Sequence, residues 1–164
     1  MKLKKWTTVA ITAAFSFWVY RMIRKDLIDD NGEIDLLART IWGEARGEGQ
    51  TGMTAVANVV MNRVKKGGWW GATVQDVVLK PYQFSVWNDG DVNKKKALEV
   101  TTADSSFWTA KKIASLAYNG QLDDITGGAT HYYAKSISQP AWTLRMTKTA
   151  QIGNHIFYKE GTQA

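Results

Sequence analysis

The chain has 164 residues with no cysteine and two prolines, and 45% of the residues are hydrophobic, which suits one domain with a substantial core. This composition excludes disulfides, thiol nucleophiles and Cys-ligated metal centres, and it also excludes a disordered or collagen-like chain. The net charge of +6 comes entirely from residues 1–25, because residues 26–164 hold fifteen basic and fifteen acidic residues, and a neutral domain argues against a nucleic-acid partner.

An uncharged stretch, residues 6–20 with the sequence WTTVAITAAFSFWVY, lies between basic residues near the N-terminus. As a helix it would extend about 22 Å, which is shorter than the ~30 Å hydrocarbon core of a bilayer. Snorkelling of the flanking Lys and Arg side chains closes that gap. We interpret residues 1–25 as a signal-anchor helix in a membrane, with a cleaved signal peptide and a buried core helix as the alternatives.

Helical periodicity dominates the first part of the domain, which we expect to begin at residue 26. Apolar residues at helical spacing, with glycine or Asn-Gly stops, predict helices over residues 33–45, 51–66, 73–79 and 104–118. Thr73 and Asp76 fit a capping box for the short third helix, and Asp104 or Ser105 caps the fourth.

The C-terminal part has a different pattern. Residues 126–138 (TGGATHYYAKSIS) and 148–159 (KTAQIGNHIFYK) combine β-type residues with glycine-containing turns, which predicts short strands or hairpins. Residues 26–164 are therefore expected to form one α+β domain that is mostly helical and carries a small β element.

Several kinds of site are excluded by the absence of their motifs. The chain has no phosphate-binding GxxxxGK[ST] loop, no GxSxG elbow and no HExxH, and we expect no metal and no cofactor. Residues 89–93 (DGDVN) resemble the start of a calcium loop, but Lys94 and Val100 occupy the positions of its Gly and Glu, so a turn is favoured. The run Lys94–Lys96 is also interpreted as a solvated turn, and His131 and His155 as structural side chains.

The carboxylates of the segment GEARGE are the best candidates for chemistry. Glu44 and Glu48 are four residues apart, but the neighbouring glycines indicate that the helix ends near Glu44. In a last helical turn, Glu44 would lie beside unpaired carbonyls and the negative end of the helix dipole, which favours the protonated carboxyl. A protonated carboxyl is what a general acid at a glycosidic oxygen requires, although this position is also typical of a solvated side chain.

Six segments in order carry a family resemblance: LARTIWGEARGE, GMTAVANVVMNRV, PYQFSVWND, TGGATHYY, PAW and IGNHIFY. Together they cover most of residues 35–158, and the chain resembles the spore-cortex-lytic cell wall hydrolase family. The resemblance implies a lysozyme-like fold and an enzyme that cleaves peptidoglycan glycan strands. Many members are lytic transglycosylases, which leave a 1,6-anhydro-muramic end.

The resemblance also assigns residues. Glu44 matches the catalytic acid/base, and Glu48 matches a second glutamate with a structural or supporting role. The full set of residues implied in substrate binding is Glu48, Gln83, Ser85, Trp87, Tyr132 and Tyr133. His131 stands where other members can carry aromatic residues, which leaves it without an assigned role.

The implied mechanism needs one carboxyl, which protonates the oxygen linking N-acetylmuramic acid to N-acetylglucosamine and then takes a proton from the C6 hydroxyl. A hydrolytic muramidase would need a second carboxylate about 5–9.5 Å away, for which Glu48 and Asp89 are candidates. A membrane-tethered glycan-binding module without catalysis is the non-enzyme alternative.

The signal anchor and the muralytic domain together resemble a phage signal-anchor-release endolysin. This resemblance implies an enzyme that is held at the host inner membrane through residues 6–20, is released to the periplasm as a monomer, and there meets its peptidoglycan partner.

Overall fold

The computed structural model describes residues 30–161. The predicted anchor helix within residues 1–25 lies outside the described residues. Within residues 30–161, no helix is long and apolar enough to cross a membrane. All contacts reported below lie in the compact unit that begins at Ile34.

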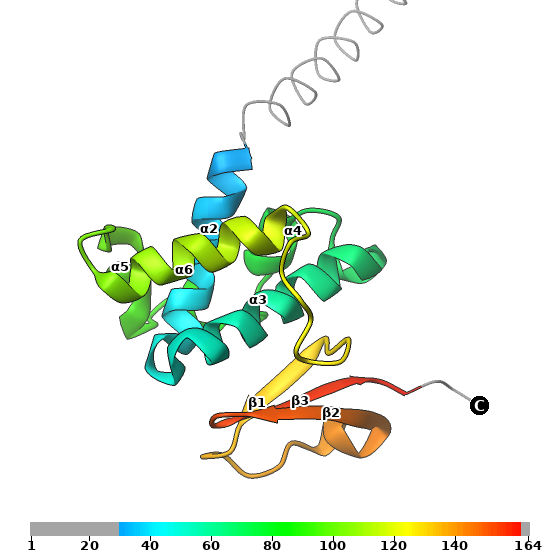
Figure 1. Ribbon diagram of the computed structural model, residues 1–164. Helices are drawn as coiled ribbons and strands as arrows, with labels where there is room; N and C mark the ends of the chain where they lie inside the picture. Colours follow the sequence, from blue (N-terminus) through cyan, green and yellow to red (C-terminus); the bar gives the residue numbers. More distant parts are fainter. Residues whose placement is uncertain (1–29, 162–164) are drawn as a thin grey trace, which may run out of the picture. The chain divides into compact units, whose positions relative to one another are not determined.

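Five α-helices make up most of the regular secondary structure in the described part of the chain (Figure 1): α2 (Asp30–Ala45), α3 (Gly49–Lys66), α4 (Val74–Val78), α5 (Val92–Glu99) and α6 (Ser105–Tyr118). Short 3-10 turns cover Arg46–Glu48, Gly68–Trp70, Ser85–Trp87 and Ala141–Arg145. The four helices predicted from periodicity are confirmed, and the mostly helical α+β class is confirmed with them.

Side-chain caps explain where two of these helices begin. The Thr73 hydroxyl accepts a hydrogen bond from the backbone N–H of Asp76 at 3.0 Å, but the Asp76 carboxylate accepts from the N–H of Ala72, so only half of the predicted capping box forms. Asp104 caps α6, because its carboxylate accepts from the N–H groups of the first turn at Ser106 and Phe107.

Helix α5 was not predicted, and the interpretation of Lys94–Lys96 as a turn is wrong. The Asp91 carboxylate accepts from the N–H of Asn93 at 2.7 Å and starts a helix that contains all three lysines. This helix buries little besides Ala97, so its charged residues show no strong apolar periodicity. A turn does precede it at Asp89 and Gly90.

The β element is a three-stranded antiparallel sheet with the order β1-β3-β2, formed by β1 (His131–Ala134), β2 (Met146–Ile152) and β3 (His155–Glu160). Strands β2 and β3 form a hairpin through Gly153 and Asn154, and Gly153 has a φ of +54° that favours glycine. The predicted late β element is therefore confirmed.

Helix α3 connects the two layers, as Figure 1 shows, because it packs against the other helices and also against the sheet. Val56 and Val60 belong to the helical core with Leu37, whereas Val59 packs with Phe157 of strand β3. Burial on both sides of one helix fixes the sheet against the helical layer. The candidate site lies at this junction.

Candidate active site

Glu44 lies in the last turn of α2, as expected, and accepts hydrogen bonds from three donors. The Ser85 hydroxyl and the backbone N–H of Val86 donate to its Oε1, at 3.1 and 2.9 Å. The Tyr132 hydroxyl donates to Oε2 at 3.0 Å. A helix end, a short turn and a strand therefore converge on one carboxylate, which fixes its position and orientation.

The neighbours of Glu44 in the sequence allow this approach. A Cβ on Gly43 would lie 2.4 Å from Cγ2 of Val86, so only glycine lets the donor turn come this close to α2. The Arg46 guanidinium donates to the Gly43 carbonyl at 3.2 Å and lies 4.4 Å from the Trp42 ring centroid. The sequence argument assumed unpaired carbonyls at this helix end, whereas Arg46 provides a donor for them.

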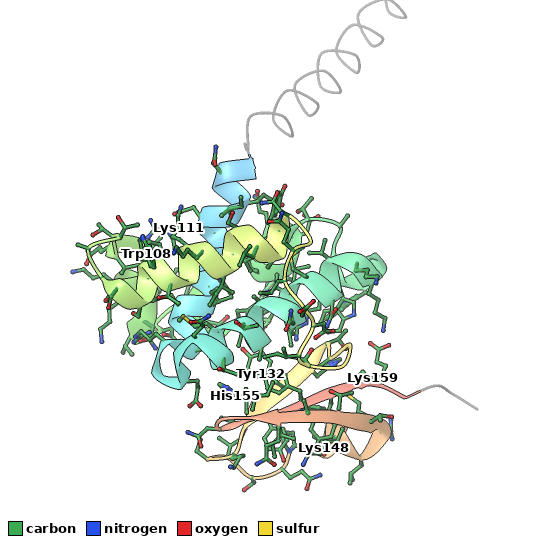
Figure 2. The ribbon with its side chains drawn as sticks, viewed as in Figure 1. Trp108, Lys111, Tyr132, Lys148, His155 and Lys159 are labelled. Carbon is green, nitrogen blue, oxygen red and sulfur yellow. The ribbon has the colours of Figure 1, made fainter. Side chains whose placement is uncertain are left out.

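Tyr132 is a fixed neutral donor. Burial and the neighbouring Glu44 raise the pKa of Tyr132 well above its ordinary value, so the phenol keeps its proton at neutral pH. Its ring contacts His155 and Phe157, with centroid distances of 5.1 and 5.7 Å. The packing of the ring therefore holds the hydroxyl towards Glu44. Figure 2 shows Tyr132 next to His155.

Arg63 is a buried cation that the sequence analysis missed. It is 5% exposed, and its Nε donates to the Thr130 carbonyl at 2.8 Å. Burial lowers the pKa of Arg63 to about 10, against the opposing influence of Tyr132 and Glu44, so it is still charged at neutral pH. The signal was its position on the buried face of α3, at helical spacing from Val60.

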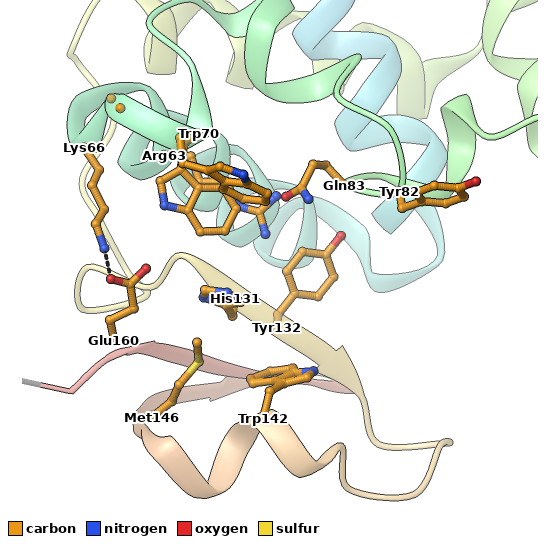
Figure 3. A pocket seen from close by; sticks show the side chains of 13 residues that line it. Arg63, Lys66, Trp70, Tyr82, Gln83, His131, Tyr132, Trp142, Met146 and Glu160 are labelled. Atoms are coloured by element: carbon orange, nitrogen blue, oxygen red, sulfur yellow. Dashed lines mark hydrogen bonds and ion pairs between the residues drawn. The ribbon is translucent and has the colours of Figure 1, made fainter.

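Glu44 and Tyr132 each line a different cavity. Tyr132 lines the larger one, of about 740 Å³, together with Arg63, Trp70, Gln83, His131 and Trp142 (Figure 3). Glu44 lines the smaller one, of about 450 Å³, together with Glu48, Lys135, Asn154 and His155. The hydrogen bond between Tyr132 and Glu44 thus joins a wall of one cavity to a wall of the other.

Glu48 binds the β2–β3 turn. Its two carboxylate oxygens accept from the backbone N–H and the side-chain amide of Asn154, at 2.9 and 3.0 Å. These bonds from Asn154 lower the pKa of Glu48. A Cβ on Gly153 would lie 2.2 Å from Oε2 of Glu48, so the turn approaches the carboxylate closely. Asp89, the other candidate for a second carboxylate, is exposed and pairs with Lys94 at 2.7 Å.

The remaining predicted site residues divide into two groups. Gln83 lines the larger cavity and Ser85 bonds to Glu44. Trp87 instead packs against the helical core, and its indole N–H donates to the Thr40 hydroxyl at 3.0 Å. Tyr133 stacks on Tyr158 with a centroid distance of 6.0 Å, and neither Trp87 nor Tyr133 lines the two cavities.

Both histidines lie next to the site. The ring of His131 is 5.1 Å from that of Trp70 and 5.4 Å from that of Trp142. Burial, together with the charge of Arg63, lowers the pKa of His131 to about 4, which makes it neutral at pH 7. Burial also lowers the pKa of His155.

This combination of a helical layer, a small antiparallel sheet and a glutamate held between them defines a class of catalytic domain with solved members. The catalytic domain of the Bacillus cereus SleB protein matches with a TM-score of 0.63 and 32% identity, over 79% of this chain and 91% of that one. The catalytic domain of the germination-specific lytic transglycosylase SleB from Bacillus anthracis matches with a TM-score of 0.57 and 31% identity, over 77% and 93%.

Sequence comparison identifies the family. The profile of the cell wall hydrolase family matches residues 47–158, and the chain belongs to this family, as its motifs predicted. The spore cortex-lytic enzymes of Halalkalibacterium halodurans and Bacillus cereus are 33% and 34% identical over 127 residues. These matches cover 77% of this chain but only 34% and 44% of those proteins, so the chain spans less than half of their length.

Proposed function

We propose that this domain cleaves the glycan strand of peptidoglycan between N-acetylmuramic acid and N-acetylglucosamine, as a lytic transglycosylase with Glu44 as its acid/base. The observation that carries the proposal is the Glu44 carboxylate, held by three donors at the junction of two cavities. A glycan strand that runs through both cavities would place a glycosidic oxygen beside this carboxyl. Membership of the cell wall hydrolase family supports the choice of polymer.

Glu44 gives up one proton and regains another, so it is protonated again when the reaction ends. Protonated Glu44 donates its proton to the glycosidic oxygen as the bond from that oxygen to C1 of the muramic residue breaks, and this proton leaves on the hydroxyl of the departing N-acetylglucosamine. The acetamido carbonyl of the substrate stabilises the positive charge that develops at C1. The C6 hydroxyl oxygen then bonds to C1, and the Glu44 carboxylate takes the proton of that hydroxyl. The N–H of Val86 and the hydroxyl of Tyr132 hold the carboxyl in place throughout.

The contacts of Glu48 favour this one-carboxyl mechanism over hydrolysis. Both oxygens of Glu48 are engaged by Asn154. A hydrolytic muramidase needs a second carboxylate that activates water or attacks the sugar. For Glu48 to take that role, it would first have to break its hydrogen bonds to Asn154 in the β2–β3 turn. Hydrolysis remains the alternative reaction, and non-catalytic glycan binding the alternative function.

The test is to incubate the full chain with peptidoglycan and to weigh the products. Transglycosylation gives muramic ends that are lighter by one water than those of hydrolysis. Glu44→Gln should lower turnover by at least about 100-fold, because a positioned acid/base contributes that much. The matched control is Glu99→Gln, an exposed glutamate on α5 whose replacement should leave turnover unchanged. Hydrolytic ends, or an active Glu44→Gln variant, would refute the proposed mechanism.

We also propose where the enzyme acts. The uncharged residues 6–20 between basic flanks support an anchor in the bacterial inner membrane, and loss of the membrane potential would release the enzyme to the periplasm, as in a signal-anchor-release endolysin. Replacement of Ala13, Ala14 and Ser16 by Leu should strengthen insertion and delay lysis after depolarisation. Lysis at the parental rate would contradict the release step, and the mass of the released protein would reveal any cleavage of the anchor.

A further inference from the structure

The larger cavity is lined by a buried cation, Arg63, and one nitrogen of its guanidinium has no acceptor. Among the described residues, Nη1 of Arg63 has no hydrogen-bond partner although it is shielded from solvent. Its Nε is bonded to Thr130, and its Cζ lies 4.5 Å from the ring centroid of Trp70, which holds the guanidinium in place. Figure 3 shows Arg63 on the helical side of the cavity and Tyr132 on the sheet side. A buried charged donor without an acceptor is costly, so such a group is expected to meet a ligand.

The other charged groups of the cavity leave the charge of Arg63 available. Lys66 and Glu160 also line the cavity, and they form an ion pair with each other. His131 is neutral at pH 7, because its pKa is about 4. Glu44 does not line this cavity, although its charge acts on Arg63. Its two oxygens accept their hydrogen bonds from other donors. The lining therefore carries one excess positive charge, located on Arg63.

An aromatic wall accompanies this charge. Trp142 is half-buried and lines the cavity from the sheet side, with Gln83 as a further polar group. Flat apolar rings bind the faces of sugars, whereas a fixed guanidinium prefers a carboxylate over a neutral acceptor. The combination suits a sugar ring that carries an acidic substituent.

We propose that the larger cavity is a subsite for a carboxylate-bearing sugar, whose carboxylate pairs with the guanidinium of Arg63 while its ring lies against Trp142. This inference rests on the proposed function, because within a peptidoglycan strand the acid in question is the free lactyl carboxylate of a muramic residue without its peptide. When a peptide is attached, the carboxylate becomes a neutral amide. The subsite thus distinguishes peptide-free from peptide-bearing positions on the strand.

Two soluble ligands test the subsite without any cleavage. One is the disaccharide N-acetylglucosaminyl-N-acetylmuramic acid, and the other is the same disaccharide with its lactyl carboxylate converted to the N-methyl amide. Binding to the full chain, measured by calorimetry at low salt and neutral pH, should favour the acid by at least about tenfold. Equal binding of the two ligands, or binding of neither, would overturn the proposal without any variant.

Three variants then locate the preference. Arg63→Gln should bind the acid and the amide equally, whereas Lys65→Gln, which removes an exposed cation from the same helix outside this cavity, should keep the preference. Trp142→Leu should weaken both ligands to a similar extent. A preference that survives in a folded Arg63→Gln protein, or that disappears in Lys65→Gln, would contradict the role of Arg63.

The outcome is separable from that of the proposed function. Acid preference without any cleavage of peptidoglycan would leave the subsite standing and remove the transglycosylase. Anhydro products from a wild-type protein that does not distinguish the two disaccharides would do the reverse.

Discussion

Replacing Glu48 by Gln separates a structural role of this carboxylate from a catalytic one. In the structure, Glu48 accepts two hydrogen bonds from Asn154 and holds the β2–β3 turn beside the smaller cavity. Glutamine has the same size and keeps one oxygen, which can still accept from the backbone N–H of Asn154. Its amide group, however, would face the side-chain amide of Asn154 with a second donor.

The expected cost follows from these two bonds. The substitution weakens the hydrogen bond from the backbone N–H of Asn154, because its acceptor is no longer charged. It also breaks the bond from the side-chain amide of Asn154, because two donors then face each other. Because solvent reaches the carboxylate, the loss should lie near the lower end of the range for charged hydrogen bonds, at about 1 kcal/mol. For a domain of this size, the midpoint of thermal unfolding should then fall by about 2–4 °C. Turnover should stay within about twofold of the wild type, because no transition-state contact is lost.

The pH dependence provides a second readout. Asn154 lowers the pKa of Glu48 in the folded state below the ordinary value of 4.5. A lowered folded-state pKa means that the stabilisation is fully present above that ordinary value and is lost as the pH falls through the folded-state pKa. The difference in unfolding midpoint between wild type and Glu48→Gln should therefore shrink in the acidic range below about pH 4.5.

Thermal unfolding monitored by circular dichroism and product release from peptidoglycan measure the two quantities side by side. If Glu48→Gln lost turnover as severely as Glu44→Gln while its unfolding midpoint stayed unchanged, the structural role would be refuted. Glu48 would then be the second carboxylate of a hydrolase.

Two further substitutions examine how Glu44 is held. Tyr132→Phe removes one of three donors to Glu44 and should lower the rate constant measured in single-turnover assays by about 10–100-fold. Full activity of this variant would contradict the positioning role of Tyr132. Gly43→Ala brings a Cβ to 2.4 Å from the Val86 side chain. It should lower the free energy of unfolding, measured by chemical denaturation, by about 1–3 kcal/mol, and it should also lower turnover. Gly47→Ala, where an added Cβ meets nothing within 4 Å, is the matched control for stability, and equal losses in both variants would argue against the clash.

Local sequence patterns predicted the elements whose stability depends on local features. The apolar face of α3 and the cap of α6 at Asp104 are visible in the sequence, and so is the glycine turn between β2 and β3. Helix α5 escaped prediction because it buries little besides Ala97 and leaves a mostly charged face in solvent.

The candidate site was predictable only in part, because its contacts are made by tertiary folding. The motif located Glu44 and Tyr132, and the structure joins them by a hydrogen bond. Successive strand residues point to opposite faces, so the motif alone could not show that Tyr133 belongs with Tyr158 and not with Glu44. Arg63 was not predicted as a site residue, because it lies among the apolar residues of α3 and the local pattern does not show which backbone carbonyl accepts a hydrogen bond from its guanidinium.

The three donors to Glu44 come from positions 41, 42 and 88 residues further along the chain. Long-range contacts of this kind form late, after the costly closure of large loops. In an extended polypeptide, Glu44 therefore lacks the donors Ser85, Val86 and Tyr132. The hydrogen bond from Tyr132 can form only after the sheet has packed against the helices. The topology thus couples the assembly of the site around Glu44 to the docking of the sheet on the helical layer.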